Sequence, residues 1–343
     1  MSGSICMAIL GAAALAMALH AAHAADYYAG KIINIYVGTG ENAGAVSEIP
    51  RAMVDVMSDH VPGHPTFVIR FMPGAGGIKA ANYIYGIAPQ DGTVYGFITR
   101  GFILAPVLTD KAHFDPSKFN WIGSPLAQPS VGAVWNASTK VRTIQDAMRV
   151  QTVMGATSMG QDTGIFPTML NRFIGTKFKI VSGYKSSPDI ELAMERGEVT
   201  GKIGWTWGAL NSGHTANWLK DGKITLLVQL GLTKYHEIPA NVPLALDLAK
   251  NPEARQVMEL LCAPSATGYP TFMGPRVPKD RIEIMRAAYR NTMADPRFRA
   301  AMKQMNLEVE PVRGEDIESI VKRIYAMPPS VGKRARELMP LSK

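Results

Sequence analysis

Short runs rich in β-branched and aromatic residues alternate with apolar residues at helical spacing along most of this sequence. In the first half, the predicted strands are Lys31–Val37, Thr66–Phe71 and Thr93–Ile98. The helix face predicted after the first strand carries Val46, Ile49, Met53, Val56 and Met57. This alternation predicts an α/β fold with mostly parallel sheets.

The second half continues the same alternation. Its predicted strands are Val131–Trp135, Gln151–Ala156, Phe178–Ser182, Thr200–Trp205 and Lys223–Leu230. Helical patterns lie near Ile165–Phe173 and Pro188–Arg196, and Gly197 is placed to end the second of them. Asn251-Pro252 and Asp295-Pro296 predict two further helix starts, because each places a capping side chain directly before a proline.

The first residues form a segment of their own. Met7 to Leu19 is apolar without interruption, and Ala22-His23-Ala24 has the small-x-small pattern of a cleavage site. The apolar run is shorter than the ~20 residues that span a bilayer. We therefore predict a signal peptide over residues 1–24, a mature chain that begins at Ala25 or Asp26, and a periplasmic location. One feature departs from the signal-peptide pattern, because Met1 to Cys6 carry no Lys or Arg. The alternative interpretation is a membrane-anchoring helix.

Length and composition bound the remaining possibilities. The 343 residues suggest about two domains at ~150 residues each. The net charge of +8 is scattered rather than clustered with aromatic residues, which argues against nucleic acid and suits a surface biased toward anions. After removal of Cys6 with the signal, Cys262 cannot form an internal disulfide, and its apolar neighbours predict a buried, inert thiol.

The first glycine-rich loop, Gly38 to Gly44, invites comparison with a dinucleotide-binding turn. Its spacing is one residue too long for that fingerprint, and the next strand, Thr66–Phe71, carries no acid to hold a ribose. The loop instead offers backbone N–H groups at a helix N-terminus, which favour an anion.

Three more loops share this design: Met72–Gly77, with a proline and three glycines, Thr157–Gly164, with hydroxyls and glycines, and Tyr184–Ser187, with hydroxyls. In the third loop, Asp162 or Thr163 is expected to cap the following helix. The alternative is that the glycines serve only as turn formers.

Catalytic patterns are weak. His60 and His64 flank Pro62-Gly63, so they cannot share a helix face as metal ligands would. Neither a G-x-S-x-G nor an H-E-x-x-H motif occurs. The acids of one helix and its exit are interpreted as a solvated face, and they are Asp189, Glu191, Glu195 and Glu198. We expect no catalytic residues, no metal and no cofactor.

Five features, in this order, resemble the extracytoplasmic receptors of tripartite tricarboxylate transporters, the Bug or TctC family. They are a glycine-rich loop ending in Arg51, PGAGG at Pro73–Gly77, Ala88-Pro89-Gln90-Asp91-Gly92, Phe114-Asp115-Pro116 through Trp121-Ile122-Gly123, and Tyr184-Lys185 with Arg196-Gly197-Glu198-Val199. The similarity covers essentially all of the mature chain. One departure is Ser47, which stands where the family commonly has Asp, so the first loop is expected to contact its ligand differently.

The resemblance implies a two-lobed clamshell of the periplasmic-binding-protein (Venus flytrap) type, with the ligand at the lobe interface. We expect lobe 1 to use residues 26–128 and 266–343, and lobe 2 to use 129–265. Segments Pro125–Ser130 and Ala263–Tyr269 are predicted as hinges, because small residues and prolines cluster there.

The predicted ligand contacts follow strand ends, where ligands bind in open α/β sheets. From lobe 1 they are Gly38, Thr39, Gly40, Gly74, Ala75, Gly76, Thr99 and Arg100, and from lobe 2 they are Ser158, Asp162, Thr163, Tyr184 and Trp205. Arg100 would pair a second carboxylate, with an ordinary surface charge as the alternative. Tyr184 and Trp205 would wall the ligand, with core packing as the alternative.

The sequence and the resemblance together predict a solute-binding protein, expected to be a monomer. It would capture a small organic or aromatic carboxylate and deliver it to a membrane permease pair. A ligand-sensing subunit of a membrane kinase would share the same site, and an exported enzyme is the third hypothesis.

Overall fold

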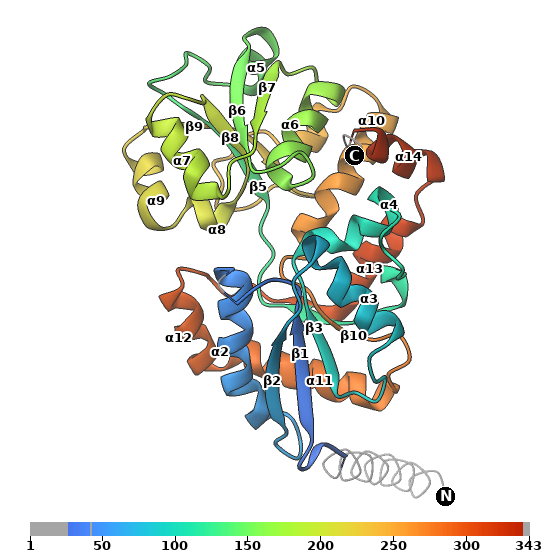
Figure 1. The fold of residues 1–343 in the computed structure, drawn as a ribbon. Helices are drawn as coiled ribbons and strands as arrows, with labels where there is room; N and C mark the ends of the chain where they lie inside the picture. Colours follow the sequence, from blue (N-terminus) through green and yellow to red (C-terminus); the bar gives the residue numbers. More distant parts are fainter. Residues whose placement is uncertain (1–26, 42, 339–343) are drawn as a thin grey trace, which may run out of the picture. The chain divides into compact units, whose positions relative to one another are not determined.

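The computed structural model describes residues 27–41 and 43–338, so the predicted signal peptide and its cleavage site lie outside the described residues (Figure 1). The chain forms two compact units. The first contains the chain up to Phe102, His113–Pro125 and Tyr269–Glu318. The second contains Ile103–Ala112, Leu126–Gly268 and the chain from Ser319 onward.

The first unit is built on a six-stranded sheet in the order β11-β4-β10-β3-β1-β2. Its strands are β1 (Ile32–Val37), β2 (Thr66–Phe71), β3 (Val94–Phe97), β4 (Asn120–Ser124), β10 (Thr271–Met273) and β11 (Val312–Arg313). Its helices are α2 (Ala45–His60), α3 (Ile78–Gly86), α11 (Lys279–Ala294), α12 (Pro296–Gln304), short 3-10 turns at Ala75–Gly77 and Pro116–Lys118, and the start of α13 (Gly314–Tyr325). A further 3-10 turn, Arg100–Leu104, and α13 each run from the first unit into the second.

Apolar periodicity explains these elements. In β1 the side chains of Ile33, Ile35 and Val37 are buried in alternation, as a strand period of two requires. On α2 the residues Ile49, Met53, Val56 and Met57 are buried, whereas Val46 is only half-buried. Helices α2 and α11 pack against each other, and α3 packs next to β3 (Figure 1).

The second unit is built on a five-stranded sheet in the order β7-β6-β8-β5-β9. Its strands are β5 (Ser130–Trp135), β6 (Thr152–Ala156), β7 (Phe178–Ser182), β8 (Gly201–Thr206) and β9 (Ile224–Leu230). Its helices are α4 (Ala105–Leu108), α5 (Ile144–Arg149), α6 (Asp162–Phe173), α7 (Ser187–Glu195), α8 (Trp207–Leu210), α9 (Gly213–Lys220), α10 (Pro252–Cys262), α14 (Pro329–Glu337), and 3-10 turns at Ala245–Leu248 and Ala263–Ala266.

Two apolar clusters cover this second sheet. One cluster joins Ile203 of β8 to side chains of α6 and α10, and it includes Cys262, which is buried as predicted. The other joins Trp205 of β8 to side chains of α7, α8 and α9. Helix α7 is therefore held against the sheet at the end of β7, next to one of the predicted loops.

Both sheets are mixed. Strand β1 pairs in parallel with β2 and β3, and β6 pairs in parallel with β7 and β8. The remaining pairings are antiparallel, because β10 and β11 in the first sheet and β5 in the second run opposite to the other strands of their sheets. The α/β prediction is confirmed, but mostly parallel sheets are not what forms. Parallel pairing is confined to the strands that carry the predicted loops.

Two segments that we expected in lobe 1 belong to the second unit, namely Ile103–Ala112 and the chain after Ser319. Helix α14 packs on α4 and α10, with Val331 and Ala335 buried in the same cluster as Val257. The Arg336 guanidinium also donates to the Val107 carbonyl at 2.9 Å.

Candidate ligand-binding site

Two predicted loops and the predicted contacts Thr99 and Arg100 leave the first sheet side by side. Val37, the last residue of β1, is paired with Phe71 at the end of β2 and with Phe97 at the end of β3. Because these strands are parallel, the loops that follow them lie at one edge of the sheet. The structure therefore brings together Gly38–Gly40, Gly74–Gly76 and Thr99–Arg100 in the first unit.

The contact between these loops requires glycine at two positions. The Gly38 amide donates to the Phe97 carbonyl at 3.1 Å. A Cβ on Gly38 would lie 3.0 Å from the Cα of Gly77, and a Cβ on Gly77 would overlap the buried Ile98 side chain. For Gly38 and Gly77, the interpretation as packing residues is sufficient.

Other glycines of the same loops face open space. A Cβ on Gly40 or Gly76 would meet no atom within 4 Å. The PGAGG segment is exposed from Pro73 to Gly76, and each residue from Gly74 to Gly77 has a positive φ, including Ala75 at 48°. The segment therefore presents its backbone to solvent, and it uses a conformation that only glycine adopts easily.

Hydrogen-bonding groups border this edge. The Thr39 hydroxyl oxygen is buried and has no hydrogen-bond partner among the described residues. The Thr99 hydroxyl donates to the Gly76 carbonyl at 3.4 Å, which joins two of the loops. Arg100 is half-buried and lies close to Tyr269; burial raises the pKa of the Tyr269 phenol, and the Arg100 guanidinium opposes that rise.

Ser47 closes the first loop onto its helix. Its hydroxyl accepts from the Ala43 amide at 3.1 Å and donates to the Gly44 carbonyl at 2.9 Å. Arg51 donates to the Glu41 carbonyl at 3.3 Å and pairs with Glu48. The residue that departs from the family pattern is thus fully buried and serves the geometry of the loop.

The second unit repeats the arrangement at the ends of β7, β6 and β8. Strand β6 lies between the other two and is parallel to both. The Thr157 amide donates to the Thr163 hydroxyl oxygen at 3.0 Å, which closes the loop after β6. Ser158 and Gly160 are exposed on this loop, and a Cβ on Gly160 would meet no atom within 4 Å.

The capping prediction for this loop is wrong by one residue. Helix α6 begins at Asp162, and its N-cap is Gln161, which makes no side-chain cap hydrogen bond. Thr163 lies inside the helix, is 6% exposed, and uses its hydroxyl to hold Thr157. The Thr163 hydroxyl, which we expected to cap the helix, therefore closes the loop instead.

Three helices that follow predicted loops share this lack of a cap. The N-caps of α2, α3 and α6 are Gly44, Gly77 and Gln161, and none makes a side-chain hydrogen bond to its helix. Helices α5, α7, α10 and α12 are capped by the side chains of Thr143, Ser186, Asn251 and Asp295. Helices α4, α8, α9, α11 and α14 also lack a side-chain cap, so what sets α2, α3 and α6 apart is the exposed loop before each. An uncapped helix N-terminus leaves donors and a positive dipole end for an anion.

The two aromatic residues predicted to wall the ligand lie mainly against the core. Trp205 is 2% exposed, and its indole N–H donates to Glu191 at 2.9 Å. Tyr184 is half-buried and packs against the same cluster; burial, with a smaller contribution from the Glu198 carboxylate, raises the pKa of its phenol. Core packing, the alternative interpretation, describes the Trp205 side chain.

Sequence reasoning missed a buried ion pair beneath the loop after β7. Glu191 was assigned to a solvated helix face together with Asp189, Glu195 and Glu198, but it is 6% exposed, and it pairs with the fully buried Lys202 at 3.0 Å. Burial lowers the pKa of Lys202 to about 8, although the Glu191 carboxylate opposes that shift. A lysine inside an apolar strand was the available signal, because a buried charge needs a partner.

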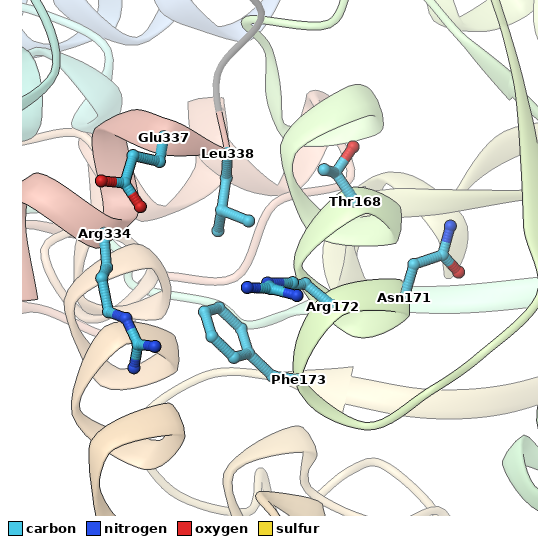
Figure 2. Close-up of a pocket in the computed structure, with 7 residues that line it drawn as sticks. All are labelled: Thr168, Asn171, Arg172, Phe173, Arg334, Glu337 and Leu338. Carbon is cyan, nitrogen blue, oxygen red and sulfur yellow. The ribbon is translucent and has the colours of Figure 1, made fainter.

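A cavity of 540 Å³ in the second unit lies elsewhere. Figure 2 shows Arg172 and Phe173 of α6 facing Arg334 and Glu337 of α14 across it. The residues lining it include none of the predicted ligand contacts. It lies at the C-terminal half of α6, whereas the predicted loop precedes the N-terminus of that helix.

Among residues 27–338 as described, no helix combines the length and the apolar character that crossing a bilayer requires. No protein-family model matches the sequence, and no curated protein matches it significantly in sequence.

Solved structures nevertheless share the fold. A TctC solute-binding protein from Polaromonas matches with a TM-score of 0.66 at 17% identity, over 90% of this chain and 99% of that one. The periplasmic binding protein BugD matches with a TM-score of 0.60 at 17% identity, over 91% and 98%. MatC from Rhodopseudomonas palustris with bound malate matches with a TM-score of 0.58 at 16% identity, over 90% and 99%. At this level of identity the similarity establishes the fold, and it confirms the resemblance to TctC-type proteins at that level.

Proposed function

We propose that this chain is an extracytoplasmic solute-binding protein that captures a small carboxylate at its strand-end loops. The observation that carries the proposal is the set of three helix N-termini without side-chain caps, at α2, α3 and α6, each behind a loop with exposed backbone. Backbone N–H groups and the positive ends of helices bind carboxylates without a charged side chain. The fold shared with solute-binding proteins, one of them with bound malate, supports this assignment.

The proposal includes a transport role. The chain acts in the periplasm by binding rather than by catalysis, as a monomer without a cofactor, and hands its ligand to a membrane permease pair. It does not bind nucleic acid. Support comes from the fold shared with TctC and BugD, and from the scattered distribution of the positive charge.

A thermal-shift screen with malate, other di- and tricarboxylates, aromatic acids and amino acids tests the ligand class. At a ligand concentration of about 100 Kd, binding stabilises the native state by ~2.7 kcal/mol. For a protein of this size that corresponds to a rise of roughly 5–10 °C in Tm. If no carboxylate raises Tm at millimolar concentration, the proposed ligand class is wrong.

Three glycine variants locate the site. Gly40, Gly160 and Gly86 each have open space where a side chain would project, and none has a positive φ. Gly40 and Gly160 lie on proposed ligand loops, whereas Gly86 ends α3 and serves as the control. We expect Gly40→Leu and Gly160→Leu to weaken carboxylate binding about tenfold or more with Tm unchanged, and Gly86→Leu to bind normally. Full affinity in both loop variants would place the ligand elsewhere.

A further inference from the structure

The loop after β7 is attached to the sheet by few bonds of its own. The Gly183 and Tyr184 amides both donate to the Ala156 carbonyl of β6, at 3.1 and 3.3 Å. The following residues, Lys185 and Ser186, are exposed before α7 begins at Ser187. Besides the packing of Tyr184 against the apolar cluster, the position of this loop depends on how the first turn of α7 is held.

Lys202, on β8, binds that turn from the side of the sheet. Its ammonium donates to the Ser187 hydroxyl at 2.8 Å and to the Glu191 carboxylate at 3.0 Å, and it lies 4.3 Å from the centre of the Trp205 ring. The side chain is 0% exposed. An ammonium has three donors, so the two hydrogen bonds and the ring face occupy them in a fixed direction.

Glu191 connects this ammonium to the rest of the unit. One of its oxygens accepts from both Lys202 and the Trp205 indole, and the other lies 3.3 Å from the ring nitrogen of the exposed His214. The carboxylate thereby joins α7, β8 and α9. Since Glu191 and Ser187 are one turn apart on α7, Lys202 forms hydrogen bonds to two successive turns of the helix.

Stability alone does not account for such a pair. Replacing a buried ion pair with apolar side chains of similar volume is often neutral or stabilising, because desolvation cancels the attraction between the charges. A directional bond to Ser187 is what an apolar pair cannot supply. The pair is therefore better explained by the geometry that it imposes on the start of α7.

We propose that Lys202 and Glu191 are positioning residues of the carboxylate site, which fix the loop Gly183–Ser187 through the hydrogen bond from Lys202 to Ser187. The inference rests on the proposed function in that this loop is one of the proposed ligand loops. Neither residue contacts the ligand, since Lys202 is fully buried and the Glu191 side chain is 8% exposed.

Replacing Ser187 tests the hydrogen bond from Lys202 without removing the cap of α7. The cap of α7 is made by Ser186, whose hydroxyl accepts from the Asp189 amide and contacts the Asp189 carboxylate. Ser187→Ala therefore removes the tether from Lys202 and leaves both the cap and the ion pair. Ser187→Thr keeps a hydroxyl and is the rescue variant. Ser212→Ala, which removes an exposed hydroxyl bonded to the Ala209 carbonyl, is the control.

Hydrogen exchange of the Gly183 and Tyr184 amides gives a readout that needs no ligand. Loss of one hydrogen bond corresponds to about 5- to 10-fold faster exchange, and we expect this in Ser187→Ala and in the double variant Glu191→Met/Lys202→Met. Ser187→Thr and Ser212→Ala should exchange as the unaltered protein does. The double variant should regain a normal Tm and still exchange quickly, which a purely stabilising role would not produce.

Malate, or the carboxylate with the largest thermal shift in the screen above, is the affinity probe. Ser187→Ala is expected to bind it about 5- to 10-fold more weakly, in step with the loss of loop protection. If the Gly183 and Tyr184 amides exchange at the same rate in Ser187→Ala as in the unaltered protein, the inference is wrong. It is also wrong if these amides exchange faster while the carboxylate binds with full affinity. If no carboxylate binds the unaltered protein, the proposed function fails on its own, and the exchange measurement still decides whether Lys202 positions the loop.

Discussion

The packing of Gly77 leads to a quantitative prediction. Its Cβ would overlap Cγ2 of Ile98, which is β-branched and 0% exposed, so the neighbour cannot move aside at low cost. Overpacking of this kind costs ~1–3 kcal/mol. The φ of 93° adds about 1 kcal/mol for any residue with a Cβ. We expect Gly77→Ala to destabilise the first unit by about 3 kcal/mol.

Gly76→Ala is the matched control. Gly76 also has a positive φ, of 65°, but its Cβ would project into open space. The backbone contribution of about 1 kcal/mol remains and the overpacking contribution disappears. At 2–4 °C per kcal/mol for a unit of this size, Tm should fall by roughly 6–12 °C in Gly77→Ala and by roughly 2–4 °C in Gly76→Ala.

Circular dichroism can follow the melting of both variants, and hydrogen exchange in β1 and β3 can assign the loss to the first unit. The close approach of the loop after β2 to Ile98, at the end of β3, is the cause we infer, so its signature is the difference between the two variants. If Gly77→Ala loses no more stability than Gly76→Ala, the contact with Ile98 is not what requires glycine at this position.

Three further predictions concern stability. Asn251→Ala should cost the second unit about 1 kcal/mol in urea denaturation, because Asn251 accepts from the Ala254 amide at 2.8 Å, whereas Asn251→Asp should retain the cap. Burial lowers the pKa of Lys202 to about 8 against 10.5 in the unfolded chain, so the unfolded chain binds more protons between these values. Stability should therefore rise with pH from about 8 to 10.5 relative to Lys202→Met, and equal urea midpoints across that range would contradict this. Arg281→Ala should lower the stability of the first unit by about 1 kcal/mol, because the guanidinium lies 3.8 Å from the centre of the Tyr27 ring; an unchanged melting curve would show that the contact is weak.

Local signals predicted the strands that carry the site. Strands β2 and β7 match their predicted bounds to the residue, and proline or glycine lies close to both ends of each. By contrast, no local signal marks β10 as a strand. It has three residues, Thr271–Met273, and its partners β4 and β3 lie about 150 and 175 residues earlier in the chain. No local pattern encodes a pairing of that kind.

Helix starts show where competition between bonds defeats a local rule. Asn251 and Asp295 cap their helices as predicted. The Asp295 carboxylate does so although it also binds His60 and the Arg297 guanidinium. Thr163 does not cap α6, because its hydroxyl accepts from Thr157 across the loop. The prediction for Glu191 is wrong for a related reason. Its position on α7 suggested exposure to solvent, but the fold brings Lys202 of β8 against its carboxylate.

The glycines of the loops fall into two groups, those required by packing and those that face open space. Gly77 and Gly164 are required by packing, since a Cβ on either would overlap neighbouring atoms. Gly40, Gly76 and Gly160 have open space beyond their Cα atoms, and Gly40 and Gly160 have no positive φ to maintain. Turn formation therefore does not explain Gly40 or Gly160, whereas an approaching ligand would. Both lie on loops before uncapped helices, so the positions least needed by the fold are the ones that a carboxylate would contact.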